Sequence, residues 1–302
     1  MKINNLPPQY NTDNLPKISI VTPSFNQATY LEATILSILN QNYPNLEYII
    51  IDGGSTDGSV DIIKKYEDKI AYWVSEPDGG QYQAIQKGFD KSTGEIMAWL
   101  NSDDMYHQNS LFVVAEIFSQ FTDIQWLTGV PTCFNELGNI VKIQTQDEAW
   151  SLYRFLLRGR DFNFIQQESI FWRRSLWEKS GRYVSTQYTL ASDFELWRRF
   201  FYYEKLYSVN TILGGFRFRM SNQKSLEQGA QYNAEMEKIR QAYPLSKKQV
   251  FRLNCCVAYR KTILRLFRNR GFIRKITKHL YNYPPTLIYN RFKDTFEWSK
   301  YF

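Results

Sequence analysis

Residues 46–58 read LEYIIIDGGSTDG, and this stretch decides the fold. Its first six residues form a mainly apolar run of strand length that ends at Asp52. Gly53, Gly54 and Gly58 then predict a turn, after which apolar residues recur at helical spacing as far as Tyr66. A buried strand that leads through an acidic turn into a helix is the repeating unit of α/β proteins.

The same unit recurs on both sides of this stretch. A β-branched strand precedes it and is expected to end at Pro23, and Asn26 is expected to cap the helix that follows. The predicted strands lie at 18–22, 46–51, 70–75 and 95–100, with a helix at 81–89 before the last. This alternation predicts the α/β fold class, with a mostly parallel sheet flanked by helices.

Polar and turn-forming residues stand at or just past the ends of these strands. They are Pro23, Asp52, Asp78 and the pair Asp103 and Asp104. In an open α/β sheet the carboxyl ends of the strands meet at one crevice, where ligands bind. Each residue taken alone can instead be an ordinary turn former. As a set they favour a binding site.

The chemistry of these residues points to a nucleotide diphosphate. Asp103 and Asp104 are neighbouring hard oxygen ligands, which suit Mg²⁺ or Mn²⁺ when substrate phosphates complete the coordination, although such a pair also caps helices. Asp52 can accept hydrogen bonds from a base or a ribose, and the glycines after it allow close backbone approach. The chain has no GxxxxGK[ST] loop and no GxGxxG turn, which disfavours kinases, P-loop NTPases and dehydrogenases.

The composition is that of a folded protein. Of 302 residues, 43% are hydrophobic and 22% are charged, and no apolar run approaches the roughly 18 residues that cross a membrane. The three cysteines form neither a metal-ligand spacing nor an even disulfide framework, and no apolar signal core opens the chain. We therefore expect a cytoplasmic location and do not expect a transmembrane enzyme.

Four motifs, taken in order, resemble the family 2 glycosyltransferases. They are KISIVTPSFN at 17–26, EYIIIDGGSTDG at 47–58, WVSEPDGG at 73–80 and AWLNSDD at 98–104. These enzymes have the nucleotide-diphospho-sugar-binding fold called GT-A. The resemblance implies a GT-A catalytic domain at 17–224. It does not cover the polar lead-in at 1–16 or the C-terminal region at 225–302, which the residues themselves indicate to be basic and mainly helical.

The resemblance also implies which residues hold the nucleotide. Pro23 and Asn26 would line its site, and Asp52 would contact the uracil or the ribose. Asp78 and Gly80, in the segment EPDGG, would contact the nucleotide as well.

The metal and the catalytic base follow from the same resemblance. Asp104 would hold Mn²⁺ or Mg²⁺, and Asp103 the ribose or the sugar, with Asp103 as a further metal ligand. The segment SDFELW at 192–197 matches the one that carries the family's base, which makes Asp193 the predicted base and Glu195 the second choice. An inverting transferase needs one such carboxylate to take the proton of the acceptor hydroxyl. QES at 167–169 looks like the acceptor-side segment.

One position departs from the family pattern. Members carry a His in a Phe-Arg-x-His segment, and the matching residues here, FRFR at 216–219, end in Arg219. A guanidinium cannot ligate a metal. Either Arg219 neutralises the donor diphosphate itself, or Asp104 and the phosphates hold the metal alone, so we expect weaker metal dependence. His107 and His279 are single and are expected to be non-catalytic.

The charge of the chain is divided between two parts. Residues 245–302 carry fourteen Lys and Arg against Asp294 and Glu297, a net charge of +12, whereas the total of +7 leaves −5 for the rest. Apolar and basic residues there share neighbouring helical faces, namely Leu253, Val257, Leu264 and Phe267 beside Lys261, Arg265 and Arg268. Such a helix either lies in an anionic membrane interface or packs in a bundle with a solvated basic face.

The sequence leaves three functions to compare. The first is a metal-assisted, inverting glycosyltransferase that moves a sugar from a UDP-linked donor to a saccharide or lipid-linked acceptor in surface polysaccharide synthesis, peripheral to the inner face of the plasma membrane. The second is a catalytically weak partner subunit that binds nucleotide sugar, which Arg219 favours. The third is nucleic-acid binding through the basic region, which lacks any recognised reading module, so nucleic acid is not an expected partner.

Overall fold

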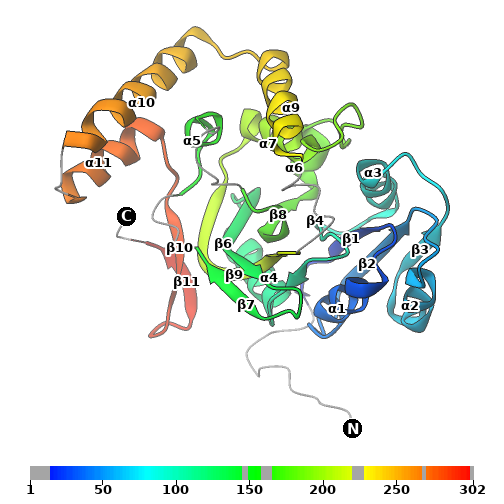
Figure 1. The fold of residues 1–302 in the computed structure, drawn as a ribbon. Coiled ribbons are helices and arrows are strands. Elements are labelled where there is room, and N and C mark those ends of the chain that lie inside the picture. Colours follow the sequence, from blue (N-terminus) through cyan, green and yellow to red (C-terminus); the bar gives the residue numbers. More distant parts are fainter. Residues whose placement is uncertain (1–13, 145–148, 158–164, 220–227, 267–269, 300–302) are drawn as a thin grey trace.

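The four predicted strands form one half of a single mixed sheet that is flanked by helices (Figure 1). The structure is a computed structural model that describes residues 14–144, 149–157, 165–219, 228–266 and 270–299. Its strands are β1 (Ile18–Ser24), β2 (Leu46–Asp52), β3 (Tyr72–Ser75), β4 (Ile96–Trp99), β5 (Met105–Tyr106), β6 (Trp126–Phe134), β7 (Ile140–Ile143), β8 (Ile170–Arg173), β9 (Tyr207–Arg217), β10 (Thr286–Asn290) and β11 (Thr295–Trp298). Its α-helices are α1 (Ala28–Leu39), α2 (Ser59–Lys65), α3 (Gln81–Lys91), α4 (Ser110–Gln120), α5 (Leu152–Leu156), α6 (Arg174–Lys179), α7 (Ser192–Tyr203), α9 (Gly229–Ala242), α10 (Lys247–Leu266) and α11 (Arg270–Tyr281).

The order and direction of the first strands agree with the prediction. β3, β2, β1 and β4 lie side by side in that order, and each neighbouring pair is parallel. The register brings Ser24, Asp52 and Ser75 to the same level. The carboxyl ends of these strands therefore meet at one edge, and the polar residues that follow them come together there.

The other half of the sheet brings a second set of segments to the same edge. β8 is antiparallel to both β4 and β6, and β6 is parallel to β9. The short strand β5, directly after Asp104, pairs with β9 at Gly214 and Gly215. A Cβ atom at Gly214 would lie 2.1 Å from the backbone oxygen of Glu168, so this close approach requires a glycine. The end of β9 is thereby fixed against the acidic pair.

The start of the chain differs from the prediction at two residues. Pro23 does not end the first strand, because β1 continues through it to Ser24. Asn26 is not the cap of α1, since Gln27 holds that position and makes no side-chain cap. Asn26 instead adopts a left-handed backbone conformation (φ 51°), and its side-chain oxygen accepts a hydrogen bond from the N–H of Thr56. Asn and Asp tolerate this conformation better than most residues.

The C-terminal region is helical as predicted but also completes the sheet. After α9, α10 and α11, strand β10 pairs in parallel with β9, and β11 pairs with β10. The sequence did not predict these two strands. The side chains of Leu264, Phe267, Lys261, Arg265 and Arg268, on which the amphipathic face depends, lie outside the described residues. Among the helices of the described part, none is both long and apolar enough to span a bilayer.

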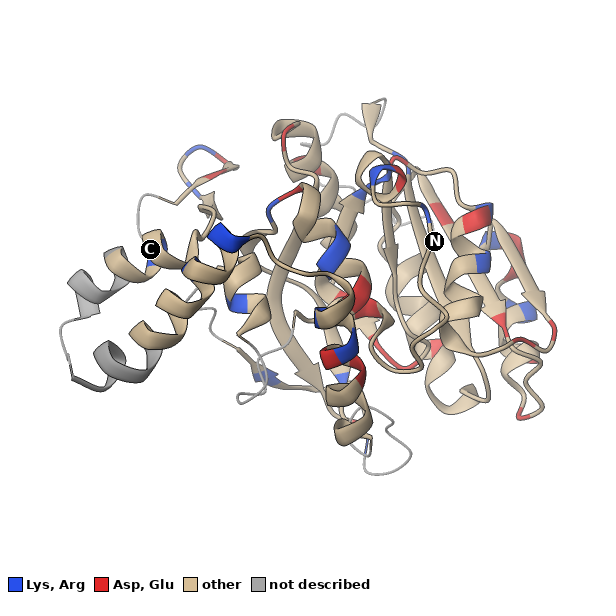
Figure 2. Ribbon diagram, turned by 90° about the horizontal axis from the view of Figure 1, so that it is seen from above, with Lys and Arg blue, Asp and Glu red and all other residues tan. Residues whose placement is uncertain are grey.

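The acidic residues are unevenly distributed over the molecule. Figure 2 shows most of the acidic residues on the part of the molecule away from α10 and α11. The carboxylates discussed below belong to this acidic part.

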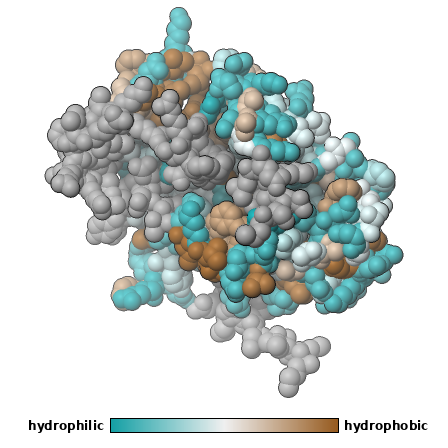
Figure 3. All heavy atoms as spheres, viewed as in Figure 1, coloured by the Kyte–Doolittle hydropathy of each residue, from teal (hydrophilic) through white to brown (hydrophobic). Residues whose placement is uncertain are grey.

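Strand β7 is unusual because all four of its residues are exposed. Its apolar side chains are Ile140, Val141 and Ile143, and Leu137 in the preceding turn is 86% exposed. Figure 3 shows hydrophobic side chains on this face, around the position that β7 has in Figure 1. β7 therefore pairs with β6, but its side chains lie at the surface rather than in the core.

Buried tryptophans join the segments that carry the polar residues. Trp99 at the end of β4 stacks on Trp197 of α7, with ring centroids 5.6 Å apart and planes within 8°. Trp172 of β8 meets both rings edge-on, at 5.7 Å and 5.8 Å. Trp99 is therefore a core residue, and the cluster holds β4, β8 and α7 in fixed relative positions.

Candidate active site

Asp52 organises the turn after β2. It is completely buried, and its carboxylate accepts hydrogen bonds from the N–H of Gly54 (3.1 Å) and from the N–H (2.8 Å) and hydroxyl (2.6 Å) of Ser55. The hydroxyl of Ser75 donates a further bond at 2.7 Å. The N–H of Asn26 donates to the Ser55 hydroxyl, which ties the end of β1 to the same turn. Asp52 holds the loop in shape, and its predicted contact with a base or ribose stays a prediction.

Asp78 lies against this turn. A Cβ atom at Gly53 would come within 3.1 Å of Asp78 Oδ2, so Gly53 leaves room for the carboxylate. Asp78 Oδ1 accepts the N–H of Gly80 at 2.7 Å. Gly80, with φ 113°, has a backbone conformation that glycine adopts readily, and it directly precedes α3. The turns after β2 and β3 therefore pack directly against each other at this edge of the sheet.

Asn101 links α3 to the acidic pair. Its side-chain oxygen accepts a hydrogen bond from Gln81 at 2.7 Å, and its amide nitrogen donates to Asp104 Oδ2 at 3.1 Å. Gln81 is the first residue of α3, directly after Gly80. The acidic pair is therefore connected to the Asp78 segment through two side-chain amides.

Asp104 is buried, with 1% of its surface exposed. Its Oδ1 accepts the N–H of Arg217 at 2.8 Å, and it shares a hydrogen bond with the buried carboxyl of Glu168. Burial raises the pKa of Glu168 to about 7, and burial with the nearby charges of Glu168 and Asp103 raises the pKa of Asp104 well above its usual range. A hydrogen bond between two carboxyl groups requires one proton, and these raised pKa values favour its retention near neutral pH.

Asp103 faces a guanidinium. Its Oδ2 lies 3.1 Å from Nε of Arg219, and the two side chains are 17% and 13% exposed. Burial raises the pKa of Asp103, while the charge of Arg219 opposes this shift. Arg219 also lies 5.7 Å from the ring centre of Tyr30, and its Nη1 is 3.4 Å from Oε1 of Gln27. The guanidinium therefore sits among the acidic pair, α1 and the residue before it.

The predicted metal fits these residues poorly. Both oxygens of Asp104 accept protein hydrogen bonds, and the carboxylate of Asp103 is paired with Arg219. Within the described ranges, no three His, Cys, Asp or Glu side chains form a group that could hold a metal ion. The binding of Mn²⁺ or Mg²⁺ through Asp103 and Asp104 stays a prediction. The side chain of Asp103 is more exposed than that of Asp104.

Asp193 lies in the first turn of α7 and is partly buried. Its Oδ1 accepts the N–H of Phe194 at 2.7 Å. Tyr82 of α3 donates a hydrogen bond to the backbone oxygen of Leu190 at 2.7 Å, and burial together with the charge of Asp193 raises the pKa of Tyr82 well above its usual range. The charge of Asp193 also contributes to the raised pKa of Glu168. Asp193 therefore belongs to the same group of carboxylates.

Glu195 has different surroundings, although it is only two residues away. It is 2% exposed, and both of its oxygens accept hydrogen bonds from Arg199, at 2.8 Å and 2.9 Å. The hydroxyl of Tyr243 donates to the same carboxylate. These hydrogen bonds indicate a structural role for Glu195, which binds Arg199 and Tyr243 inside the protein.

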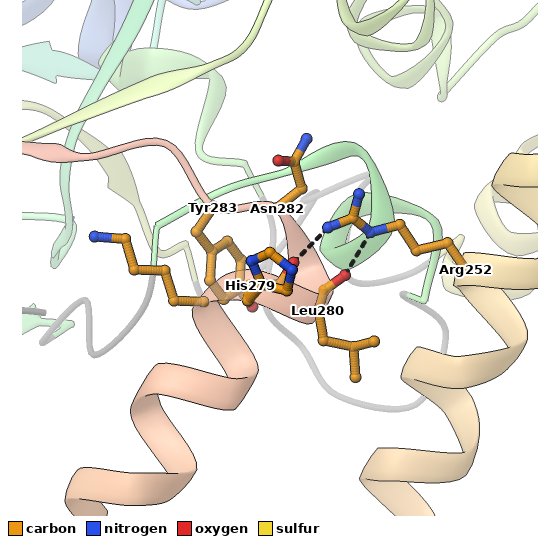
Figure 4. A pocket seen from close by; sticks show the side chains of 6 residues that line it. Arg252, His279, Leu280, Asn282 and Tyr283 are labelled. Atoms are coloured by element: carbon orange, nitrogen blue, oxygen red, sulfur yellow. Dashed lines mark hydrogen bonds between the residues drawn. The ribbon is translucent and has the colours of Figure 1, made fainter.

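The single histidines lie apart from this group. Nε2 of His107 is 2.7 Å from the Thr132 hydroxyl, the ring packs beside Phe134, and burial lowers its pKa. His279 lines a pocket of about 680 Å³ at the end of α11 (Figure 4). In that pocket Arg252 donates to the backbone oxygens of His279 and Leu280. The pocket belongs to the packing of α10 on α11.

With this geometry in view, the comparisons with known proteins decide the family. Residues 19–181, more than half of the chain, match the family described as Glycosyl transferase family 2. The chain belongs to glycosyltransferase family 2. The matched range includes Asp52, Asp78, Asp103 and Asp104 and ends before Asp193. The roles of Asp193 and Arg219 are therefore predictions that the family match does not reach.

Curated relatives of this family 2 glycosyltransferase match it over part of their length. An uncharacterized glycosyltransferase of Haemophilus influenzae is 34% identical over 164 residues, which are 52% of this chain and 65% of the relative. TuaG of Bacillus subtilis, a putative teichuronic acid biosynthesis glycosyltransferase, is 37% identical over 99 residues, 32% of this chain and 39% of TuaG. The chain thus spans less than two thirds of the length of these relatives.

Solved structures share the fold at low sequence identity. Residues 1–349 of Staphylococcus aureus TarS, in complex with UDP-GlcNAc, give a TM-score of 0.62 at 17% identity over 88% of this chain and 78% of that one. The mannosyltransferase PcManGT of Pyrobaculum calidifontis, in complex with GDP-Man and Mn²⁺, gives 0.57 at 16% identity over 75% and 66%. These likenesses confirm the predicted GT-A-type fold.

The structure brings most of the predicted residues to one edge of the sheet of this glycosyltransferase. They are Pro23, Asn26, Asp52, Asp78, Gly80, Asp103, Asp104, Asp193 and Arg219. From the sequence, Arg217 had no predicted role, and Glu168 was named only as part of the acceptor-side segment QES. Glu168 lies two residues before the apolar strand β8 and is buried, and a buried carboxyl group requires a hydrogen-bonding partner.

Proposed function

We propose that this family 2 glycosyltransferase is an inverting enzyme. It transfers a sugar from a nucleotide-diphosphate donor, first of all a UDP-sugar, to a saccharide or lipid-linked acceptor in surface polysaccharide synthesis. The observation that carries the proposal is the convergence of Asp52, Asp78, Asp103 and Asp193 at one edge of the sheet. The name of TuaG and the UDP-GlcNAc bound to TarS support the substrate class and the pathway class.

Asp193 is the proposed base. Its carboxylate takes the proton of the acceptor hydroxyl while that oxygen forms a bond to C1 of the sugar, on the face opposite the leaving group. The bond from C1 to the phosphate oxygen breaks, and its electron pair leaves with the nucleotide diphosphate. The position of Asp193 in the first turn of a helix favours the charged form of the carboxylate that this step needs.

We expect Asp193→Asn to lower transfer by about 10²–10⁴-fold, the usual contribution of general base catalysis. Donor binding should persist, because the nucleotide is held by other residues. The measurement is sugar transfer or donor hydrolysis, together with the rise in melting temperature on adding UDP-GlcNAc, GDP-mannose and related donors.

Asp61→Asn, at an exposed position in α2, is the matched control and should leave transfer unchanged. Near-normal turnover by Asp193→Asn would refute the assignment of the base. Donor binding without any hydrolysis or transfer in the unaltered protein would favour the second function, a catalytically weak partner subunit.

We also propose that the basic residues of 225–302 contact an anionic membrane surface at the inner face of the plasma membrane. The net charge of +12 over 245–302 supports this, as does Phe251, which is 71% exposed on α10 close to Lys247 and Lys248. A lipid-linked acceptor would then be reached at the surface where it is embedded.

A further inference from the structure

Two guanidinium groups lie beside the acidic pair at the end of β9. The side chain of Arg217 is buried, and its Nε donates to the backbone oxygen of Asp103 at 2.6 Å. Its Nη1 donates to the backbone oxygens of Asn135 (3.2 Å) and Glu136 (2.9 Å). These backbone acceptors fix the position of the Arg217 charge.

Arg219 is held by different partners, two residues further along the chain. Its Nε faces the carboxylate of Asp103 at 3.1 Å, and Nη1 reaches Gln27 at 3.4 Å. Both guanidiniums lie over the ring of Tyr30, at 5.1 Å for Arg217 and 5.7 Å for Arg219. Stacking on an aromatic ring orients a guanidinium without using its N–H donors.

Two cationic side chains already face the acidic pair. Nε of Arg219 lies 3.1 Å from the carboxylate of Asp103, and Nε of Arg217 donates to the backbone oxygen of the same residue. Arg217 and Arg219 supply two permanent positive charges at the same place. A divalent cation beside Asp103 would meet strong repulsion from both guanidiniums, and it would have to displace Arg219 from its carboxylate.

We propose that Arg219 takes the place of the divalent ion and binds the donor diphosphate directly, so that donor binding requires no metal. The inference rests on the proposed function, because it assumes a nucleotide-diphosphate donor. A guanidinium pairs with two phosphate oxygens at once and remains charged at any physiological pH. When the C1–oxygen bond breaks, the extra negative charge on the diphosphate is stabilised by Arg219, and no proton has to move to it.

The first test is the binding of nucleotide diphosphates to the unaltered full chain, measured by titration calorimetry. UDP and GDP are titrated once in EDTA and once in Mn²⁺. We expect the affinity for the preferred nucleotide to differ by less than about threefold between the two conditions. Electron paramagnetic resonance of Mn²⁺ without nucleotide should show the free ion only.

The second test uses variants of Arg219. Arg219→Gln should weaken nucleotide binding in EDTA by about tenfold or more, and Arg219→Lys should recover part of the loss, because it restores the charge but not the paired geometry. Arg219→His places a metal ligand beside Asp103, so it should bind weakly in EDTA and gain affinity with Mn²⁺. Arg291→Gln, an exposed change in the β10–β11 turn, is the control and should behave like the unaltered protein.

The outcomes separate this inference from the function on which it rests. Binding of UDP or GDP only in the presence of Mn²⁺ would overturn the inference and leave the glycosyltransferase proposal intact. Absence of binding of any nucleotide diphosphate in either condition, with no sugar released from a donor panel, would refute the proposed function instead. If Arg219→Gln fails to fold, the comparison of EDTA with Mn²⁺ in the unaltered chain still decides.

Discussion

Two carboxylates of α7 show how the surroundings of a residue determine its chemistry. Asp193 is partly buried and belongs to a group of carboxylates at the edge of the sheet. Glu195 is enclosed by Arg199 and Tyr243. A buried carboxylate that is fully paired stabilises its neighbours and is poorly placed to take a proton from a substrate. The sequence places both side chains in one motif, and only their packing separates the two roles.

Glu47 gives a residue-scale prediction that involves no catalytic group. Its carboxylate contacts Lys17 (2.6 Å), the hydroxyl of Ser19 (2.5 Å) and both the N–H (2.6 Å) and hydroxyl (2.7 Å) of Thr93. Burial raises the pKa of Glu47, but these hydrogen bonds outweigh burial and hold the pKa at about 2, against 4.5 for an ordinary Glu. Because the folded pKa is the lower one, the carboxylate stabilises the fold above about pH 4.5 and loses this effect as the pH falls towards 2.

We therefore expect Glu47→Gln to lower the free energy of unfolding by about 2 kcal/mol at neutral pH. The difference from the unaltered protein should shrink as the pH falls from about 4.5 towards 2, because the unfolded chain takes up a proton on Glu47 before the folded protein does. Urea unfolding at a series of pH values measures it. A difference that stays constant over this range would contradict the assignment of the stabilisation to the charged form.

Among the elements, α9 holds the segment that carries the proposed base. Glu235 of α9 accepts hydrogen bonds from three successive backbone N–H groups, those of Thr189 (3.2 Å), Leu190 (2.9 Å) and Ala191 (2.9 Å). Ala191 is the residue before α7. One carboxylate thus binds the turn that determines where Asp193 points.

Glu235→Gln is expected to lower the free energy of unfolding by about 2 kcal/mol. It should also lower kcat more than it raises the KM of the donor, because Asp193 shifts while the residues that bind the nucleotide keep their positions. Burial raises the pKa of Glu235, but the three backbone hydrogen bonds outweigh it and lower the pKa, so the stabilisation is lost as the pH falls below about 4.5. Steady-state kinetics with urea unfolding measures both effects. Glu237→Gln, exposed on the same helix, is the control, and equal effects on kcat and KM would argue for loss of stability alone.

The elements that the sequence predicted are those with a local signal. β1, β2 and β4 are buried on both faces, so their sequences are mainly apolar runs. In the helices between them, apolar residues recur at helical spacing. β10 and β11 are short and only partly buried, and β10 pairs with a strand that ends at Arg217, far back in the sequence. No local pattern encodes such a pairing, so a helical region was the expected result.

The site was predictable to a similar degree. Motifs at strand ends located Asp52, Asp78 and the acidic pair, because the direction of parallel strands brings their ends together. The partners of these residues were not predictable. That Asp104 meets Glu168, and Asp103 meets Arg219, depends on the pairing of β5 with β9 and on the glycine at 214.

At the scale of the whole molecule, the basic C-terminal region is also part of the catalytic sheet. Deleting it would remove β10 and β11 from beside β9, so a deletion would test folding together with membrane contact. Exposed single residues give a cleaner experiment. Lys247 and Lys248 at the start of α10 are both exposed.

We expect the double variant Lys247→Gln and Lys248→Gln to float less with vesicles that contain phosphatidylglycerol. Its partition coefficient should fall by roughly thirtyfold, since each basic residue near such a surface contributes about 1 kcal/mol. Its melting temperature should stay the same, because exposed changes of this kind rarely alter stability. Lys64→Gln and Lys65→Gln on α2 form the control pair. Equal flotation of all three proteins, or equal flotation with neutral vesicles, would exclude the membrane contact.

The pairing of β10 with β9 has a consequence for synthesis on the ribosome. β9 is complete at Arg217, but its outer partner begins only at Thr286, after α9, α10 and α11. At ordinary rates of translation this interval takes on the order of ten seconds, during which the outer edge of β9 has no strand beside it. Unpaired edges invite pairing with neighbouring chains. Until Thr286 and the residues after it are synthesised, the nascent chain therefore exposes a strand edge that the folded protein covers.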